Sequence, residues 1–137
     1  MKDKIFVDTN IWVYLYLENQ NKTMQAERIM KENANEIILS TQVLSELYNV
    51  LVVKRKQKNK VEAKEIIESL INDFACSGIN PEIILNATDI AIKYQYRFYD
   101  SVIIATALAN DCNILFSEDM QHNQLIENKL KIINPFI

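Results

Sequence analysis

The sequence predicts an α/β fold of three layers, in which helices flank a mainly parallel central sheet of four or five strands. Short apolar runs rich in β-branched residues alternate with longer amphipathic segments, which is the order expected of strand–helix–strand units. Acidic residues follow directly after two of the short runs. At 137 residues and 49% hydrophobic composition, the chain is expected to form a single domain over 1–137 around one core.

The first short run, Ile5–Val7, is predicted to be a buried strand and is followed at once by Asp8, Thr9 and Asn10. In an open α/β sheet, ligands collect in the crevice outside the carboxyl ends of the strands, so Asp8 is expected to face that crevice. Asp and Thr are also preferred helix N-caps, and in the alternative interpretation Asp8 or Thr9 only caps the helix that starts near Asn10. The sequence alone leaves both interpretations open.

The helix predicted after this strand covers 11–18, a segment that is mostly apolar and aromatic. Trp12, Tyr14 and Tyr16 alternate with other residues, a spacing that also suits a strand. We expect these rings either to fill the core or, because aromatic residues are enriched at interfaces, to form a surface for a protein partner.

Hydrophobic periodicity, capping residues and turn residues predict the remaining elements. An amphipathic helix over 23–33 precedes a strand over 36–39, and Ser40 or Thr41 is expected to cap the helix that follows. Pro81 suits the first turn of a later helix, where its fixed φ is favourable. The predicted helices then cover 42–56, 61–74, 81–96 and 100–110, and the predicted strands cover a short segment around Ile79, 113–116 and 130–133.

The helix predicted over 42–56 carries an acid on its apolar face. At 100° per residue, Glu46 falls between Val50 and Val53 and one turn from Val43. Glutamate is almost never fully buried without a partner. Glu46 is therefore expected either to border the core with its carboxylate in water or to reach a site that supplies positive charge.

Basic residues crowd the end of this helix and the turn after it: Lys54, Arg55 and Lys56 are followed by Lys58 and Lys60. Cations near a helix C-terminus are favoured by the helix dipole, so a solvated run of charge is one explanation. Contact with the phosphate backbone of a nucleic acid is the other.

Two further acids lie in the last third of the chain. Asp100 begins a predicted helix on its inward face, with a role as N-cap as the alternative. The next predicted strand is followed by Ser117, Glu118 and Asp119, much as the first strand is followed by Asp8. Both strand ends are therefore candidates for a site.

The composition excludes several classes of protein. A net charge of −3 argues against a protein that coats nucleic acid through bulk positive charge, although a local basic strip remains compatible with it. Two cysteines and one histidine are too few for a disulfide scaffold or a Cys/His zinc site, and they fit reduced thiols in a cytoplasm. No leader precedes Ile5 and no apolar run approaches the roughly 18 residues of a membrane span, so we expect a soluble, cytoplasmic protein without membrane contact.

The four acids Asp8, Glu46, Asp100 and Asp119 are expected to converge, because strand ends and helix starts share one edge of a parallel sheet. Two unit charges about 4 Å apart repel by about 4 kcal/mol at an effective dielectric of about 20. A cation must therefore lie among the acids, or some must be protonated. Ligands that are all oxygen favour Mg²⁺ or Mn²⁺, which suits phosphodiester hydrolysis, whereas one histidine excludes a two-histidine ribonuclease mechanism.

The acidic segments, taken in order, resemble those of PIN-domain nucleases, specifically the VapC-like toxins. The matching segments are Val7–Asn10, Ser40–Glu46, Tyr99–Ala107 and Ser117–Gln121, which together span nearly the whole chain. The resemblance implies a PIN-like fold and an endoribonuclease that depends on Mg²⁺ or Mn²⁺. It also implies a homodimer, and a cognate antitoxin whose tail covers the acidic pocket.

The resemblance also assigns residues by position. It makes Asp8, Glu46, Asp100 and Asp119 the catalytic, metal-binding acids, and it makes Thr9, Asn10 and Ser117 polar supports near them. The chain departs from many relatives at His122-Asn123, where they have a glycine, but asparagine also tolerates a left-handed conformation.

Three functions remain in view. The leading one is a metal-dependent endoribonuclease that acts as the toxin of a toxin–antitoxin pair and cleaves RNA, with Lys54, Arg55 and Lys56 as RNA contacts. The second keeps the fold but makes the protein a catalytically silent module that binds RNA or a protein partner. The third is a phosphatase or phosphotransferase with an aspartyl nucleophile, which commonly has a second aspartate where this chain has Asn10.

Overall fold

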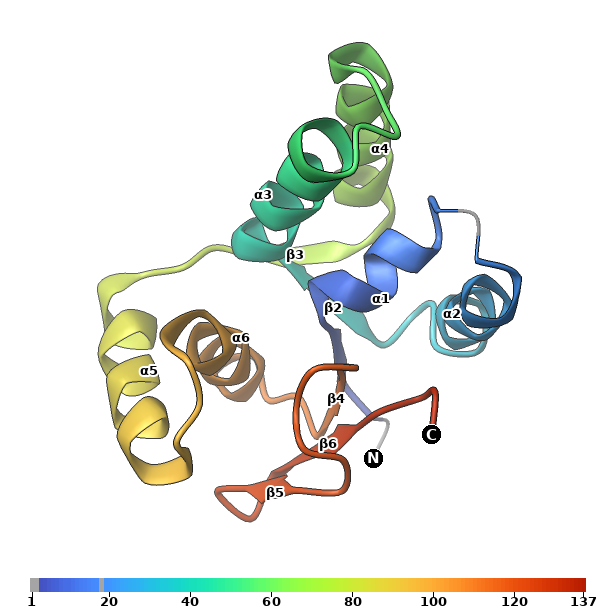
Figure 1. Ribbon diagram of the computed structural model, residues 1–137. Helices are drawn as coiled ribbons and strands as arrows, with labels where there is room; N and C mark the ends of the chain where they lie inside the picture. The colour runs from blue at the N-terminus through green and yellow to red at the C-terminus, as the bar shows by residue number, and fades with distance from the viewer. Residues whose placement is uncertain (1–2, 18) are drawn as a thin grey trace.

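The computed structural model describes residues 3–17 and 19–137, and its central feature is a six-stranded sheet with helices on both sides (Figure 1). The three-layer α/β architecture predicted from the sequence is confirmed, with six strands where four or five were expected. The strands are β1 (Ile5–Val7), β2 (Ile37–Ser40), β3 (Ala75–Ser77), β4 (Ile114–Phe116), β5 (Leu125–Ile126) and β6 (Leu130–Ile133). The helices are α1 (Thr9–Tyr14), α2 (Gln20–Glu32), α3 (Thr41–Asn49), the π-helical segment η1 (Val50–Lys54), α4 (Lys60–Asp73), α5 (Pro81–Tyr94) and α6 (Phe98–Ala109).

The order of the strands across the sheet is β3-β2-β1-β4-β6-β5, and every neighbouring pair is parallel except β5 with β6. From β1 the chain first builds outward through β2 and β3 and then returns to place β4 on the other side of β1. This reversal creates a crevice between β1 and β4 at the carboxyl ends of the strands. Val7 lies opposite Phe116 in the register, so Asp8 and Ser117 emerge side by side at that crevice.

The core fills both faces of the central strands. Phe6, Leu39 and Leu115 are fully buried in the sheet, while Trp12 and Ile104 pack on them from α1 and α6. Complete burial of one such side chain contributes roughly 1.5–3 kcal/mol relative to exposure. A smaller apolar cluster joins α5 to α6, which lie together on one side of the sheet, with α1 and α2 on the other (Figure 1). Side chains from helices on both sides of the sheet therefore pack on the strands that end at the crevice.

The structure of the N-terminal region tests whether the segment after β1 is a helix or a strand, and whether its aromatic rings lie in the core. The segment after β1 is helical, so the alternative of a strand through Trp12 and Tyr16 is wrong. The helix ends at Tyr14, and Glu18, the last residue of the predicted helix, lies outside the described residues. Trp12 is buried in the core, and Tyr14 and Tyr16 are partly buried against it, which favours packing over an exposed aromatic interface.

The predicted strands at the sheet edges were misplaced or missed. The strand expected around Ile79 lies at Ala75–Ser77, because exposed side chains on an edge strand leave no alternating apolar signal, and Ile79 instead packs against the α5–α6 cluster. The strand predicted over 130–133 is confirmed as β6. Its antiparallel partner β5 was missed because the turn between them places Glu127 and Asn128 at φ 52° and 54° without a glycine that would indicate a hairpin. Asn123, at φ 68°, does adopt the left-handed conformation expected there.

Two of the differences between the predicted and the observed helices bear on the site. The helix expected over 42–56 is divided into α3 and η1, with Ser40 as its N-cap. The helix expected to begin at Asp100 begins at Phe98 instead. Within 3–17 and 19–137, no helix combines the length and the apolar character needed to cross a membrane.

Candidate active site

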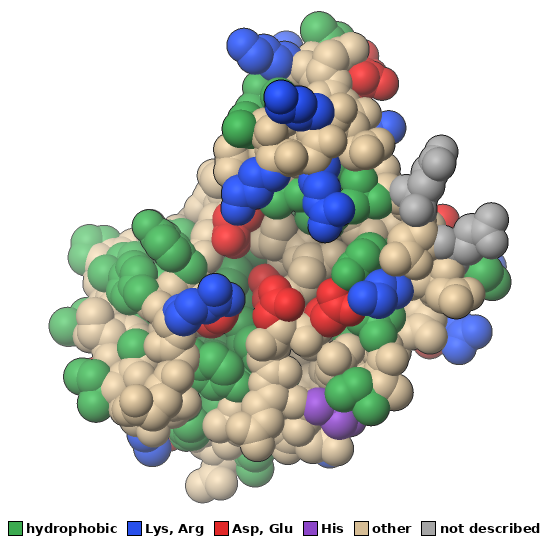
Figure 2. Space-filling model, in the orientation of Figure 1, with side chains coloured by type: hydrophobic (Ala, Val, Ile, Leu, Met, Phe, Trp, Pro, Cys, Tyr) green, Lys and Arg blue, Asp and Glu red, His purple; other side chains and the backbone are tan. Residues whose placement is uncertain are grey.

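The crevice between β1 and β4 opens into a pocket of about 780 Å³. All four acids singled out in the sequence line it, each from a different element: Asp8 after β1, Glu46 from α3, Asp100 from α6 and Asp119 after β4. Figure 2 shows acidic side chains gathered in a hollow in the middle of this face, with lysine and arginine side chains around them. The topology of the sheet, rather than closeness in sequence, brings them together.

Asp8 is the most buried of the four acids, with 6% of its surface exposed. It is the N-cap of α1, and its Oδ1 accepts a hydrogen bond from the Thr9 amide at 2.7 Å. Its Oδ2 accepts one from the Ser117 hydroxyl at 2.8 Å and a longer one from the Asn10 amide group at 3.4 Å. Both interpretations of Asp8 therefore apply, because the same carboxylate caps the helix and lines the pocket.

The charge of Asp8 has no cationic partner among these contacts. The pKa of Asp8 is raised to about 7, chiefly by burial and to a smaller extent by the negative charges of Glu46 and Asp100, while the hydrogen bonds from Ser117 and Thr9 oppose the rise. In an anionic pocket, a nearby cation stabilises the charged form of a buried carboxylate more than neutral hydrogen-bond donors do. The electrostatics of the pocket therefore favour binding of positive charge beside Asp8.

Glu46 reaches the pocket from the inward face of α3. The Thr9 hydroxyl donates to its Oε1 at 3.1 Å, which links the first two acids through one side chain. Burial raises the pKa of Glu46, and the charge of Asp100 adds to the rise. One turn earlier, Gln42 donates through Nε2 to the Tyr99 carbonyl at 3.1 Å, while its buried Oε1 has no hydrogen-bond partner among the described residues.

Asn10 and Ser117 connect Asp8 to the loop after β4. Asn10 donates through Nδ2 to Asp119 Oδ2 at 3.0 Å and accepts from the Glu118 amide through Oδ1 at 3.3 Å. Ser117 Oγ accepts from the Asp119 amide at 3.3 Å while it donates to Asp8. These two polar residues therefore fix the positions of two acids relative to each other.

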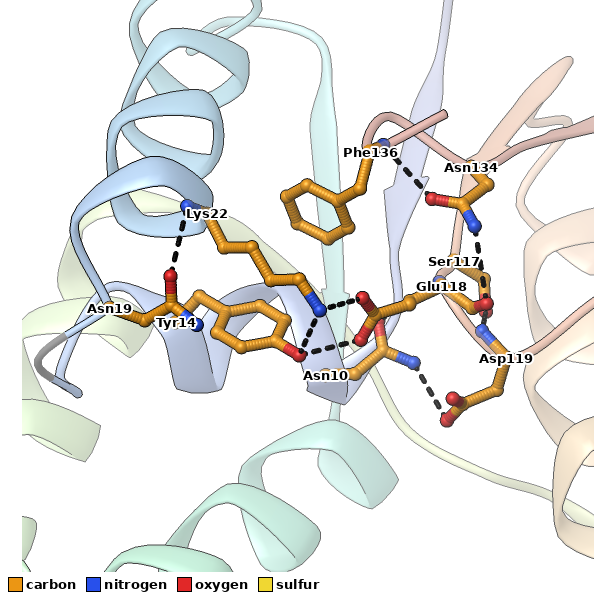
Figure 3. A network of polar contacts seen from close by, with 9 residues as sticks. All are labelled: Asn10, Tyr14, Asn19, Lys22, Ser117, Glu118, Asp119, Asn134 and Phe136. Atoms are coloured by element: carbon orange, nitrogen blue, oxygen red, sulfur yellow. Dashed lines mark hydrogen bonds and ion pairs between the residues drawn. The ribbon is translucent and has the colours of Figure 1, made fainter.

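The side chain of Glu118 anchors the same loop from outside the pocket (Figure 3). It pairs with Lys22 of α2 and accepts from the Tyr14 hydroxyl at 2.6 Å. Lys22 also lies over the rings of Tyr14 and Phe136, 5.0 and 5.4 Å from their centroids. Although burial opposes it, the hydrogen bonds from Lys22 and Tyr14 lower the pKa of Glu118. Sequence reasoning missed this network because α2, α1 and the chain terminus meet only in the folded state.

Asp100 lies in the first turn of α6, but Arg97 is the N-cap of this helix, so the alternative that Asp100 caps it is wrong. The Arg97 guanidinium pairs with Asp100 Oδ2 at 3.3 Å. The side chain of Arg97 is 83% exposed and that of Asp100 is 20% exposed. Arg97 and Tyr99 line the pocket and were not expected there, although each stands within three residues of a predicted acid.

The basic residues after α3 reach the pocket through the π-helical geometry of η1. In a regular α-helix, Val53 would realign with Glu46, because residues seven apart share a face. In η1 each backbone hydrogen bond spans five residues instead of the four of an α-helix, as the bond from the Arg55 amide to the Val50 carbonyl at 2.8 Å shows. The position that faces the pocket is therefore reached one residue later than in an α-helix. Lys54 and Arg55 accordingly line the pocket, whereas Val53 is 56% exposed.

Lys56 does not share this placement. It follows η1 in a left-handed conformation, at φ 52°, and it is not among the residues that line the pocket. Of the three basic residues expected to contact RNA, the structure therefore brings two to the acids.

The donor set of the pocket fits a hard divalent cation. In the described part of the chain, no three His, Cys, Asp or Glu side chains are placed closely enough to enclose a metal ion. Mg²⁺ needs no such enclosure, since proteins usually bind it through one or two carboxylates and leave several waters in place. Here the available donors are oxygens, and both the unpaired charge of Asp8 and the unpartnered Oε1 of Gln42 would gain from a hydrated cation.

The comparisons with known proteins agree with this geometry. The family model of the PIN domain matches residues 5–127. No curated protein sequence matches the chain.

Solved structures of similar fold include VapC toxins and toxin–antitoxin complexes. VapC20 from Mycobacterium tuberculosis, described as a sarcin–ricin-loop-cleaving toxin, has a TM-score of 0.70 and 21% identity over 85% of this chain and 92% of its own. A toxin–antitoxin complex from Klebsiella pneumoniae has a TM-score of 0.72 and 16% sequence identity, over 97% of this chain and 98% of its own. VapBC-1 from nontypeable Haemophilus influenzae has a TM-score of 0.68 and 24% sequence identity, over 97% of this chain and 98% of its own.

Proposed function

The chain belongs to the PIN-domain family, and from this premise we propose that it is a metal-dependent endoribonuclease of the VapC type. The observation that carries the proposal is the pocket at the β1–β4 crevice, where four carboxylates from four elements line one cavity around the buried charge of Asp8. Among the solved structures of similar fold, one is described as a sarcin–ricin-loop-cleaving toxin, and PIN domains typically use divalent metals.

In the proposed mechanism, Asp8 and Asp100 supply the principal ligands for Mg²⁺ or Mn²⁺, and Glu46 and Asp119 complete the pocket. When bound, the cation would activate a water and neutralise the charge that develops on the phosphodiester. Water adds to phosphorus and loses a proton, the bond to the leaving sugar oxygen breaks, and that oxygen takes up a proton, so that a phosphomonoester and a hydroxyl end are formed.

The remaining polar residues of the pocket have positioning roles in this mechanism. Ser117 and Asn10 keep the oxygens of Asp8 and Asp119 oriented, and Thr9 keeps Glu46 turned toward the pocket. Ligands held in place by such contacts lose less freedom when the cation and substrate bind.

Substrate binding is assigned to the basic residues beside the acids. Lys54 and Arg55 line the pocket from η1 and provide positive charge for the phosphates that flank the scissile bond. Lys56 lies outside the pocket, so its contribution to RNA binding is expected to be smaller.

We further propose that the protein acts in the cytoplasm as a homodimer and is neutralised by a cognate antitoxin. The Klebsiella and Haemophilus structures of similar fold are complexes of toxin with antitoxin, and their alignments cover nearly the whole of this chain. An antitoxin segment that reaches the pocket would have to carry positive charge to pair with the acids.

The second candidate function is a PIN-fold module that binds RNA or a protein without cleaving. The observation that favours it is the ion pair between Arg97 and Asp100, which already satisfies one of the acids. The two functions differ in their response to divalent ions, since a silent module would bind RNA with its affinity unchanged by Mg²⁺ or Mn²⁺.

The test of the proposed function is cleavage of RNA by the purified protein with Mg²⁺ or Mn²⁺. Asp8→Asn and Asp100→Asn are expected to abolish cleavage. Asp111→Asn is a matched control, because Asp111 is an exposed acid paired with Lys129 outside the pocket, and its φ of 60° also suits asparagine. Cleavage by Asp8→Asn or Asp100→Asn at the rate of the Asp111→Asn control would contradict the proposal.

A further inference from the structure

Tyr99 presents a large aromatic ring to solvent at the edge of the acidic pocket. It is 71% exposed, although it lines the pocket next to Asp100. Its backbone is held in the first turn of α6, and its carbonyl accepts a hydrogen bond from Gln42 at 3.1 Å. The Phe98 ring supports it edge-on, with the two centroids 5.6 Å apart. Tyr99 is therefore an aromatic surface held in place beside the proposed reaction centre.

The charges around Tyr99 indicate what it could bind. Arg97 stands two residues earlier on the same pocket edge, and Lys54 and Arg55 line the pocket from η1. Neither Lys54 nor Arg55 forms an ion pair with any described residue, so both cations are available to an anionic ligand. An aromatic face combined with unpaired cations matches single-stranded nucleic acid, in which bases stack on aromatic side chains and phosphates pair with lysine and arginine.

A base-paired RNA helix offers a different surface. Its bases are stacked on one another, and its grooves display base edges, hydroxyls and phosphates rather than free base faces. A ring at the edge of a pocket can therefore stack only on a base that is unpaired. This geometry distinguishes single-stranded or looped RNA from duplex RNA.

We propose that Tyr99 stacks on an unpaired base next to the scissile phosphate, while Lys54, Arg55 and Arg97 bind the flanking phosphates. Tyr99 is then a binding residue, and it discriminates against duplex RNA because its ring can stack only on an unpaired base. This inference rests on the proposed function, since it takes the acidic pocket to be the place where RNA is cleaved.

Binding without cleavage tests the proposal. In an Asp8→Asn background with Mg²⁺, we would measure the affinity for a short single-stranded RNA that carries 2-aminopurine, and for the perfect duplex of the same sequence. Tyr99→Ala is expected to weaken binding of the single strand by about 5- to 150-fold, the range that stacking of one base supplies, and to reduce quenching of 2-aminopurine. Tyr99→Phe keeps the aromatic ring and is expected to bind within twofold of the background protein. Duplex affinity should be the same in all variants.

Leu85→Ala is the matched control, because Leu85 is an exposed apolar residue of α5 outside the pocket. The proposal is overturned if Tyr99→Ala binds the single strand as tightly as Leu85→Ala, if Tyr99→Phe loses as much affinity as Tyr99→Ala, or if duplex affinity falls equally. It is also overturned if Tyr99→Ala shifts the oligomeric state on size-exclusion chromatography in step with the lost affinity, because Tyr99 would then belong to a protein interface. Failure of the proposed function is separate, and would show as undiminished RNA cleavage by Asp8→Asn.

Discussion

The two sides of the acidic pocket are built differently. On the side formed by β1, α1 and the loop after β4, Asp8, Asn10, Ser117 and Asp119 are joined by a continuous set of hydrogen bonds. We call these four residues the bonded side. Glu118 adds a further anchor through its pair with Lys22.

On the opposite side, formed by α6 and η1, the residues are more exposed and make fewer contacts. We call Arg97, Tyr99, Asp100, Lys54 and Arg55 the open side. Its main internal contact is the ion pair between Arg97 and Asp100, and the Arg97 side chain is mostly exposed. Exposed ion pairs of this kind contribute only about 0–1 kcal/mol to stability.

The contrast suggests a division of tasks within one pocket. Groups that hold a reacting centre must keep their geometry, and hydrogen bonds from neighbouring side chains maintain it. Groups that bind a flexible, charged chain gain from freedom to adjust. The bonded side is therefore suited to hold the cation and water, with Asp100 as the one ligand that faces it from the open side. The basic and aromatic residues of the open side are suited to receive RNA.

Among substitutions outside the four pocket acids, we expect the largest fall in cleavage rate when the Lys22–Glu118 ion pair, which anchors the bonded side, is broken. Lys22→Met and Glu118→Gln each remove the ion pair, and Lys22→Met keeps an apolar stem against the rings of Tyr14 and Phe136. We expect kcat to fall by about 10- to 100-fold, the range for losing a partner that orients a metal ligand, with little change in melting temperature.

Lys129→Met is the control for this experiment, because it breaks an exposed ion pair with Asp111 away from the pocket. Equal cleavage rates for Lys22→Met and Lys129→Met would show that the anchor does not position the bonded side.

The burial of Asp8 predicts a pH dependence of stability. Its pKa of about 7 in the folded protein lies above its ordinary value of 3.8, so its contribution to stability is fully present below about pH 4 and is lost as pH rises through about 7. Each unit of such a shift corresponds to about 1.4 kcal/mol. Without metal, the parent should therefore lose stability relative to Asp8→Asn between pH 5 and pH 8, by several degrees in melting temperature.

The difference between parent and variant isolates Asp8 from other titrating groups, such as Glu127, whose pKa is lowered by its hydrogen bond with Lys93. Melting curves in the presence of a chelator at both pH values make the measurement. If the difference in melting temperature between the parent and Asp8→Asn is the same at both pH values, ionisation of Asp8 does not destabilise the folded protein and the prediction is wrong.

A smaller effect is expected from Arg97→Ala on the open side. Loss of a charged contact to phosphate should raise KM by about 5- to 10-fold. It should leave kcat within twofold, because the ion pair of the exposed Arg97 side chain with Asp100 is expected to be weak. Arg28→Ala, at an exposed position of α2 outside the pocket, controls for loss of charge. A fall in kcat at unchanged KM would place Arg97 in the reaction instead.

The smallest expected effect is on RNA binding, in a comparison of Lys54 with Lys56. Lys54→Met should weaken RNA binding a few-fold and reduce the slope of log affinity against log salt by about 0.7, the value for one phosphate contact to a single strand. Lys56→Met should leave the slope unchanged, because Lys56 lies outside the pocket. Equal slopes for the two variants would indicate a diffuse basic surface rather than the placement produced by η1.

The sequence predicted the bonded side better than the open side, for physical reasons. β1 is fully buried and β4 is buried at Leu115, so both read as short apolar runs and the acids after them stand out. The crevice follows from the rule that ligands collect where the strand order reverses. Asp8 and Asp119 could therefore be placed from local patterns and one topological rule.

The rest depends on contacts that no local pattern encodes. Tyr99 is an ordinary helix-start residue in the sequence, and only the fold shows its ring exposed beside the acids. The π-helical turn of η1, which separates Lys54 from Val53, has no recognisable residue signature here. The Lys22–Glu118 pair joins segments that are far apart along the chain. The edge strand β3 was misplaced because its exposed side chains carry no burial pattern, and β5 was missed because it is only two residues long and its turn lacks a glycine.

Titration of the protein with Mn²⁺, followed by electron paramagnetic resonance, tests most directly whether the pocket holds a hard cation. The account predicts that the parent and the Asp111→Asn control bind Mn²⁺ with the same affinity and that Asp8→Asn binds it at least tenfold more weakly. Equal Mn²⁺ affinity in all three proteins would contradict it.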